Sequence, residues 1–329
     1  MRILIVHHGA IPAKLYGGIE RVIWGLGKEL TRLRHKVTYL VKKGSHCDFA
    51  SVLHIDEQKP ILEQISSDYD VVHFSWEPEN IRAFHLPYVI TVHGNINSTE
   101  KFDKNSIFVS KNHASRHNSD SYIYNGLDWD DYNLSDLNVE RKYFHFLGKA
   151  SWRLKNVAGA IDIIKETASE RLKVLGGVRF NLKMGIRFTL SPKVRFYGMV
   201  GGKTKDKLLN GSKGLIFPVR WHEPFGLAII ESLYFGCPVF ATPYGSLPEL
   251  INEDVGYLSN RKDELKAAIL ESKNYSSKRC HEYAREQFNS RRMTLEYLKK
   301  YEKVINSGYL NSSPPVLRKI QTAKFLDWN

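Results

Sequence analysis

Short apolar runs alternate with amphipathic segments along almost the whole chain. In the first half, runs with the length and composition of buried strands are predicted at 2–9, 36–41, 70–75, 88–94, 106–110 and 121–126. The segment GGIERVIWGLGKELTRLR (17–34) carries apolar residues at helical spacing directly after the first run. Strands that alternate with helices are typical of parallel βαβ units.

The second half repeats this alternation. Strands are predicted at 143–148, 171–177, 194–198, 214–218 and 238–242, and helices over most of the charged segment 262–307. The polar segment 132–142 has no periodicity and separates the two halves. We therefore expect an α/β protein with two doubly wound domains, residues 1–140 and 141–307. The Pro-containing tail 308–329 is expected to cross back to the first domain.

Composition excludes several classes of protein. A chain of 329 residues with 42% hydrophobic residues can form two globular cores. No apolar run approaches the roughly 18 residues that a membrane-spanning helix needs. The first residues, MRILIVHHGA, predict a buried strand rather than a signal peptide. Cys47, Cys237 and Cys280 lie far apart without metal-ligand spacing, which favours a reducing compartment and a cytoplasmic location.

Charge is distributed unevenly between the halves. Residues 1–140 contain 15 Lys and Arg against 18 Asp and Glu, a net charge of −3. Residues 141–329 contain 33 against 17, a net charge of +16. The basic half suits an anionic ligand or surface, although a solvated basic surface would give the same counts. Aromatic residues are not interleaved with these cations in the manner of a base-stacking platform, so no nucleic acid is expected.

The segment HEPFGLAIIES (222–232) is the most informative stretch. It places Glu223 and Glu231 eight positions apart on either side of an expected helix start at Pro-Phe-Gly. A helix N-terminus binds anions through its unpaired N–H groups and its dipole. Two acids beside such a site are suited to hydroxyl groups. A nucleotide sugar offers both kinds of group, because its diphosphate is flanked by the hydroxyls of a ribose and of a sugar. On spacing alone, an ordinary helix with exposed acids remains open.

The block EPFGLAIIES followed by GCPVFATPYGSLPEL resembles the donor-site signature of family-4-type retaining glycosyltransferases. The resemblance extends over nearly the whole chain to about residue 305. It implies the GT-B fold, in which two Rossmann-like domains face each other across a cleft. The first domain would bind the acceptor and the second the nucleotide sugar, with domain closure excluding water.

The resemblance also assigns roles within this block. Glu223 and the backbone N–H groups of Phe225, Gly226 and Leu227 are expected to contact the transferred sugar and the diphosphate. Glu231 is expected to bind the ribose hydroxyls of the nucleotide. Gly226 would allow a close approach of the ligand to the backbone.

Two further segments match the family in the first half. LYGGIERV (15–22) resembles the N-terminal glycine loop, in which Gly17 and Gly18 would let the backbone approach the diphosphate. TVHGN (91–95) resembles the segment that places a histidine in the cleft at a strand end. His93 is therefore expected beside the sugar as a catalytic residue. Any single histidine in a sequence is more often structural.

The segment FLGKASWRLKN (146–156) departs from the family pattern of Gly-Arg followed five residues later by Lys. Lys149 stands at the arginine position, and either Arg153 or Lys155 could supply the second cation. We favour Lys155, which would neutralise the departing diphosphate together with Lys149. The lysine at position 149 lacks the forked donor group of an arginine guanidinium, so replacing arginine by lysine here is expected to change how the diphosphate is bound. A basic run on a solvated loop is the alternative.

No metal or cofactor is expected. LDWDD (127–131) contains an Asp-x-Asp pair, which binds a metal in other glycosyltransferases. Here it resembles the family's Asn-Gly-x-Asp segment at the end of the first domain, so we do not interpret it as a metal site. His7 and His8 lack a partner at metal-ligand spacing.

Together these features predict a metal-independent retaining glycosyltransferase. Its donor would be a nucleoside diphosphate sugar, with UDP favoured over GDP, and its acceptor a glycan, a lipid-linked molecule or another hydroxyl compound in surface polysaccharide or glycoconjugate synthesis. A peripheral contact with the inner face of an anionic membrane is a further expectation. Two other interpretations stay open: a GT-B-fold nucleotide-sugar epimerase or phosphorylase, and a non-catalytic binder of anionic ligands.

Overall fold

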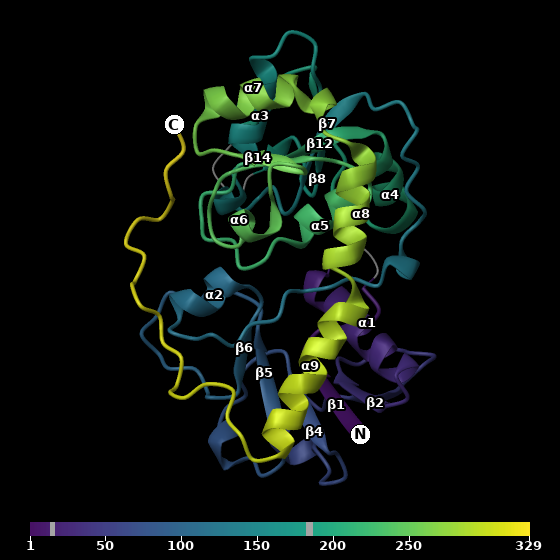
Figure 1. Ribbon diagram of the computed structural model, residues 1–329, viewed down its shortest axis with the longest axis vertical. Helices are drawn as coiled ribbons and strands as arrows, with labels where there is room; N and C mark the ends of the chain where they lie inside the picture. The colour runs from purple at the N-terminus through teal and green to yellow at the C-terminus, as the bar shows by residue number, and fades with distance from the viewer. Residues whose placement is uncertain (14–16, 182–186) are drawn as a thin grey trace. The chain divides into compact units, whose positions relative to one another are not determined.

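The computed structural model describes residues 1–13, 17–181 and 187–329. The chain forms two units, each built around its own six-stranded sheet (Figure 1). One contains residues 1–129 and 288–321 and is called here the N-terminal unit. The other contains residues 130–287 and 322–329 and is called the C-terminal unit. The expected α/β class and doubly wound architecture are confirmed.

The sheet of the N-terminal unit has the strand order β3-β2-β1-β4-β5-β6, and its paired strands run parallel. Its strands are β1 (Arg2–His7), β2 (Lys36–Val41), β3 (Ser51–His54), β4 (Val71–Phe74), β5 (Tyr88–Val92) and β6 (Ser106–Phe108). Its helices are α1 (Gly18–Arg32), α2 (Lys111–Arg116) and α9 (Ser290–Ile305). The expected strand at 121–126 makes only a single bridge, between Phe108 and Tyr122.

The sheet of the C-terminal unit has the order β11-β8-β7-β12-β13-β14, again with parallel pairs. Its strands are β7 (Tyr143–Leu147), β8 (Leu172–Leu175), β11 (Val194–Phe196), β12 (Ser212–Phe217), β13 (Val239–Ala241) and β14 (Gly256–Leu258). Its helices are α3 (Val157–Lys165), α4 (Gly202–Asn210), α5 (Leu227–Tyr234), α6 (Leu247–Leu250), α7 (Lys262–Leu270) and α8 (Ser277–Gln287). A separate antiparallel pair consists of β9 (Phe180–Asn181) and β10 (Arg187–Phe188).

Strand order determines where a ligand would bind in the C-terminal unit. From β7 the chain moves to β8 and β11 on one side and then returns to β12 on the other side of β7. Right-handed crossovers in opposite directions place their helices on opposite faces of the sheet. In sheets of this kind ligands bind at the carboxyl ends of the two strands that flank such a topological switch point, here β7 and β12. The segments that carry Lys149 and Glu223 follow these two strands.

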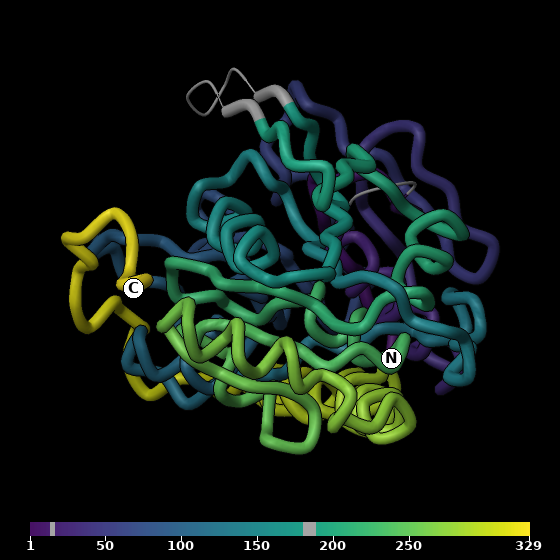
Figure 2. The backbone as a smooth tube through the Cα atoms, turned by 90° about the horizontal axis from the view of Figure 1, so that it is seen from above, coloured from purple at the N-terminus to yellow at the C-terminus, as the bar shows by residue number. Residues whose placement is uncertain are grey.

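The boundaries between the units differ from those expected. The first unit ends at Trp129 rather than at residue 140, and α9 belongs to it rather than to the second domain. The tail is divided: 308–321 belong to the N-terminal unit and 322–329 to the C-terminal unit. In Figures 1 and 2 residues 308–321 of the tail run beside the segment around α2, where the Val316 amide donates to the His117 carbonyl at 2.9 Å.

A buried polar network explains why α9 belongs to the first sheet. His73 of β4 hydrogen-bonds through Nδ1 to the hydroxyl of Tyr301 (2.7 Å) and through Nε2 to the hydroxyl of Thr91 (2.8 Å). The Thr91 hydroxyl also pairs with that of Tyr297 at 2.9 Å. All four side chains are buried. Because buried polar groups need partners, this network commits one face of α9 to β4 and β5.

We expect Tyr301→Phe to lower the free energy of unfolding by about 1–3 kcal/mol, because it leaves a buried nitrogen of His73 without its partner. Chemical unfolding of the full chain measures the change. Tyr309→Phe is the matched control, since Tyr309 is 60% exposed. Equal small effects of both substitutions would contradict a structural role for the network.

Candidate functional site

The loop between β12 and α5 is held in place by the segment that follows β13. Glu223 and Gly245 form a parallel backbone bridge, and the Ser246 amide donates to the Glu223 carbonyl at 2.9 Å. The Ser246 hydroxyl donates to the carbonyl of Phe225 at 2.6 Å. Gly226, with φ +100°, then turns the chain into α5. The structure thus fixes the loop at the carboxyl end of the sheet.

Glu223 is the partner of Lys155. Lys155 Nζ donates to Glu223 Oε2 at 2.5 Å, and Trp221 Nε1 donates to the same oxygen at 2.9 Å. Both charged side chains are largely buried. The ammonium also lies 5.0 Å from the ring centroids of Phe217 and Trp221. A lysine and a carboxylate separated by 68 positions therefore form one closely packed group at the switch point.

Glu231 has a similar environment on α5. Its Oε1 accepts hydrogen bonds from the Tyr132 hydroxyl (2.7 Å) and from Lys205 Nζ. Glu231 and Lys205 are both buried. Neither Tyr132 nor Lys205 was expected from the sequence. One signal was present: Lys205 stands three and four positions before Leu208 and Leu209, at the helical spacing of an inward face.

A second buried network fixes α5 against the sheet. His145 of β7 bonds through Nδ1 to the Ser212 hydroxyl (2.7 Å) and through Nε2 to the Ser232 hydroxyl (2.8 Å). Burial lowers the pKa of His145 to about 3, so the ring is neutral. Ser232 directly follows Glu231, and the network therefore ties the position of that glutamate to β7 and β12.

The remaining cations of the segment 146–156 point in different directions. Lys149 is exposed, with Nζ 5.6 Å from the ring of Trp152. Asn156 adopts a left-handed conformation (φ 54°) and caps α3 by accepting from the Gly159 amide at 3.1 Å. This turn directs Lys155 toward Glu223. The guanidinium of Arg153 lies instead 5.1 Å from the ring of Phe325.

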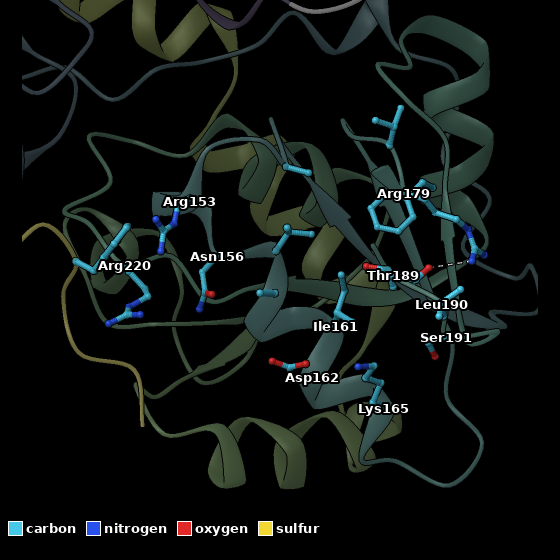
Figure 3. A pocket seen from close by; sticks show the side chains of 16 residues that line it. Arg153, Asn156, Ile161, Asp162, Lys165, Arg179, Thr189, Leu190, Ser191 and Arg220 are labelled. Atoms are coloured by element: carbon cyan, nitrogen blue, oxygen red, sulfur yellow. Dashed lines mark hydrogen bonds between the residues drawn. The ribbon is translucent and has the colours of Figure 1, made fainter. Parts of the chain in front are cut away.

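Arg153 lines a cavity of about 880 Å³ beside α3 (Figure 3). Its wall also includes Asp162 and Lys165 of α3, and Arg179 and Arg220 from loops at the carboxyl ends of β8 and β12. Glu223, Glu231 and Lys155 do not line it. Because Arg220 and Arg179 donate to backbone carbonyls, they help to hold the surrounding loops. The structure thus separates Arg153 from the Lys155–Glu223 pair.

The other expected site residues lie in the N-terminal unit. His93 follows β5, and its Nε2 is buried without a hydrogen-bond partner among the described residues. Burial lowers its pKa to about 3, so its imidazole is neutral. Gly17 and Gly18 begin α1. A Cβ on Gly17 would lie 2.7 Å from a carboxylate oxygen of Glu20, so a larger residue here would displace the Glu20 side chain. Residues 15 and 16 of the glycine loop lie outside the described residues.

Asp128, the first acid of the Asp-x-Asp pair, has a structural role. Asp128 pairs with Lys28 of α1 at 2.7 Å and with Arg32 at 3.6 Å. Over residues 1–13, 17–181 and 187–329, no group of three or more His, Cys, Asp or Glu side chains is arranged to hold a metal ion. The part of the chain that the structure describes also contains no helix with the length and hydropathy to span a membrane.

Comparison with protein-family models gives a match to "Glycosyl transferases group 1" over residues 131–287. Among curated proteins, the chain is 33% identical over 116 residues to an uncharacterized 41.2 kDa protein of the cps region of Klebsiella pneumoniae, covering 33% of this chain and 32% of that one. It is 34% identical over 118 residues to a probable sucrose-phosphate synthase of Thermosipho melanesiensis, covering 34% and 28%. The chain thus matches about a third of the length of these relatives.

Solved structures extend the similarity to both units. AviGT4, a glycosyltransferase involved in avilamycin A biosynthesis, superposes with a TM-score of 0.76 at 18% identity, covering 93% of this chain and 98% of that one. Sucrose-phosphate synthase of Thermosynechococcus elongatus gives 0.73 at 16% identity, covering 93% and 100%. Anabaena HepE in complex with UDP and glucose gives 0.64 at 18%, covering 91% and 99%.

These matches define the class of the protein. The chain has the GT-B fold, and its segment 131–287 matches the family model of glycosyl transferases group 1. The GT-B fold and the similarity to glycosyl transferases group 1 that the sequence resemblance implied are confirmed.

Proposed function

We propose that this protein is a retaining glycosyltransferase that moves a sugar from a nucleoside diphosphate sugar to a hydroxyl acceptor. The observation that carries the proposal is the Lys155–Glu223 pair at the switch point of the C-terminal unit, directly before α5. It supplies a cation for a diphosphate and a carboxylate for a sugar hydroxyl within one packed group. The match of residues 131–287 to glycosyl transferases group 1 supports the same reaction class.

In the proposed reaction, the bond between the anomeric carbon and the diphosphate oxygen breaks, and the electron pair leaves with the diphosphate. The acceptor oxygen forms a new bond to the anomeric carbon on the face from which the diphosphate departs, and its proton passes to an oxygen of the departing diphosphate. Lys155 and Lys149 stabilise the negative charge that develops on the diphosphate. Glu223 holds Lys155 and orients the sugar, and the N–H groups at Phe225, Gly226 and Leu227 contact the sugar and the diphosphate.

Residues of the two units have separate roles in this proposal. Glu231 binds the nucleotide ribose, and the Lys155 contact with Glu223 favours Lys155 over Arg153 as the second diphosphate cation. His93 and the Gly17–Gly18 loop of the N-terminal unit contact the sugar. The neutral state of His93 suits a hydrogen bond to a sugar hydroxyl rather than an ion pair. No metal ion is required.

We propose UDP as the nucleotide, because solved structures of a similar protein, HepE, contain UDP or UDP-glucose. ADP and GDP are the alternative nucleotides, and starch synthase IV of Arabidopsis was solved with ADP.

We place the reaction in the cytoplasm, in synthesis of a surface glycan, consistent with similarity to a protein of a cps region. Residues 171–220 of the C-terminal unit contain twelve Lys and Arg against one Asp, a charge that suits contact with an anionic membrane face.

The first test is thermal stabilisation of the purified chain by UDP, GDP, ADP and CMP, each alone and as sugar conjugates. A ligand at 100 times its Kd stabilises the folded state by about 2.7 kcal/mol, so one nucleotide is expected to stand out. Acceptor-dependent release of that nucleotide, with retention at the anomeric carbon, then establishes the transfer.

The same experiment separates the alternatives. A nucleotide sugar that is converted without any acceptor would indicate an epimerase, and sugar phosphate formation from inorganic phosphate would indicate a phosphorylase. Absence of stabilisation by every nucleotide would overturn the proposed function and favour a non-catalytic binder of anions. Binding of that kind should weaken steeply with salt.

A further inference from the structure

Helix α4 carries a charged residue on its inward face. Its lysines Lys203 and Lys207 are exposed, whereas Lys205 between them is only 3% exposed and shares its face with Leu208 and Leu209. Lysine is almost never fully buried unless a carboxylate pairs with it. The carboxylate here is Glu231, the residue that we assign to the nucleotide ribose.

Lys205, Tyr132 and Glu231 form a closed triangle. Lys205 Nζ and the Tyr132 hydroxyl both donate to Oε1 of Glu231, and Lys205 Nζ lies 5.1 Å from the centre of the Tyr132 ring. Two donors on one oxygen fix the rotation of the carboxylate as well as its position. Glu223 is held in the same way, by Lys155 and Trp221 on its Oε2. Glu223 and Glu231 therefore each accept a hydrogen bond from a lysine and from an aromatic side chain.

Stability alone does not account for this arrangement. The cost of desolvating both charges can exceed their attraction, and apolar residues of similar volume often replace a buried ion pair without loss of stability. A contact between α4 and α5 could therefore be made by leucines. A buried lysine is explained if a ligand requires the carboxylate to be ionised and held in one orientation, because the lysine provides both conditions.

Tyr132 is itself held in place by the segment that enters the C-terminal unit at residue 130. The next residue, Asn133, donates its backbone amide (3.2 Å) and its side-chain amide (2.7 Å) to Oδ2 of Asp206. Asp206 is buried and directly follows Lys205 on α4. Lys205 and Asp206, neighbours on α4, thus contact Tyr132 and Asn133, neighbours in the linker (132–142). These contacts leave the Tyr132 hydroxyl little freedom to move away from Glu231.

We propose that Lys205 and Tyr132 are positioning residues for the nucleotide: they hold the Glu231 carboxylate in the orientation that accepts hydrogen bonds from the 2′- and 3′-hydroxyls of the ribose. This inference rests on the proposed function, because it needs a nucleotide in this site. It assigns the ribose specificity of the chain to three residues, from the linker, α4 and α5, rather than to Glu231 alone.

The test compares UDP with 2′,3′-dideoxy-UDP, and equally GDP and ADP with their dideoxy analogues, by calorimetric titration of the full chain. Wild type is expected to bind the ribose form of its nucleotide at least about tenfold more tightly than the dideoxy form, because a charged acceptor loses its donors in the analogue. Glu231→Gln, Lys205→Met and Tyr132→Phe are expected to reduce this ratio to within about threefold of unity while affinity for the dideoxy form changes less than about twofold.

Matched controls distinguish positioning from a general effect. Lys207→Met removes an exposed lysine from the same helix, and Tyr257→Phe removes a hydroxyl from a tyrosine that is 39% exposed. Both should keep the wild-type ratio. Lys205→Arg should restore part of it. If Lys205→Met does not fold, Tyr132→Phe decides the matter, because it removes a single oxygen atom.

The outcomes separate the two claims. A wild-type chain that binds the ribose form selectively, with Tyr132→Phe retaining full discrimination, would overturn this inference and leave the proposed function intact. Equal weakening of both nucleotide forms would show a merely structural pair and would also overturn it. A wild-type chain that binds none of UDP, GDP and ADP would overturn the proposed function and this inference together.

Discussion

Glu223→Gln is expected to lower the turnover number for sugar transfer at least about 100-fold, the usual cost of removing one preorganised electrostatic group. The carboxylate is the partner of Lys155 at 2.5 Å, and both side chains are largely buried. The amide keeps the shape of the side chain but removes its charge, which leaves Lys155 without the group that holds it. Lys155→Met is expected to reduce turnover by a similar factor. Initial rates at saturating donor and acceptor measure both effects.

Two substitutions serve as controls for this prediction. Glu253→Gln changes an exposed glutamate of the same unit and should leave turnover within about twofold. Arg153→Ala should have a much smaller effect than Lys155→Met, because Arg153 contacts Phe325 and lines the separate cavity beside α3. If Glu223→Gln were folded and retained activity within a few-fold of wild type, the assignment of the Lys155–Glu223 pair to catalysis would be wrong. A larger loss of turnover for Arg153→Ala than for Lys155→Met would instead make Arg153 the second cation that binds the diphosphate.

Gly245→Ala is expected to lower the free energy of unfolding by about 2–5 kcal/mol and to reduce activity in parallel. Gly245 has φ +68°, a left-handed conformation that costs an L-residue about 1–2 kcal/mol. A Cβ at this position would also lie 2.3 Å from the Glu223 carbonyl oxygen and 2.4 Å from its amide nitrogen. Relief of this overlap requires the backbone of Glu223 to move, and such overpacking adds about 1–3 kcal/mol.

The chain offers a closely matched control for this substitution. Gly198 has the same φ of +68°, and a Cβ there would meet nothing within 4 Å. Gly198→Ala should therefore show only the conformational cost of about 1–2 kcal/mol. Thermal and urea unfolding of the two variants measure the difference, which isolates the contact with Glu223. Equal destabilisation by both substitutions would show that Gly245 is required for its φ value alone.

Much of the C-terminal site could be predicted from local sequence. The segment 222–232 carries local signals for a glycine-led helix start and two acids eight positions apart. The helix begins at Leu227, after Gly226 at φ +100°, so Pro224 and Glu223 lie in the loop before it rather than in its first turn. The strands that flank the switch point were also predictable, because buried parallel strands require short continuous apolar runs. These signals are short-range, so they can be read from neighbouring residues, although the exact start of the helix cannot.

The partners of the two acids could not be predicted in the same way. Lys205 lies in a stretch with lysines at 203, 205 and 207, which resembles a solvated basic helix, and only the packing of α4 buries the middle one. Tyr132 lies in a polar linker without periodicity. The choice between Arg153 and Lys155 depended on the turn at Asn156, which points one side chain toward Glu223 and the other toward Phe325.

The division into units shows the same limit on a larger scale. The helical character of α9 follows from the spacing of its apolar and aromatic residues, but nothing in that pattern tells which sheet the helix covers. That was decided by His73 and Thr91, more than 200 residues earlier in the chain, whose polar atoms require Tyr297 and Tyr301. The sequence by itself determined the elements, the fold class and the two glutamates, because these depend on neighbouring residues. Only the tertiary structure decided which side chains pair, because burial and hydrogen bonding join residues that are distant in the chain.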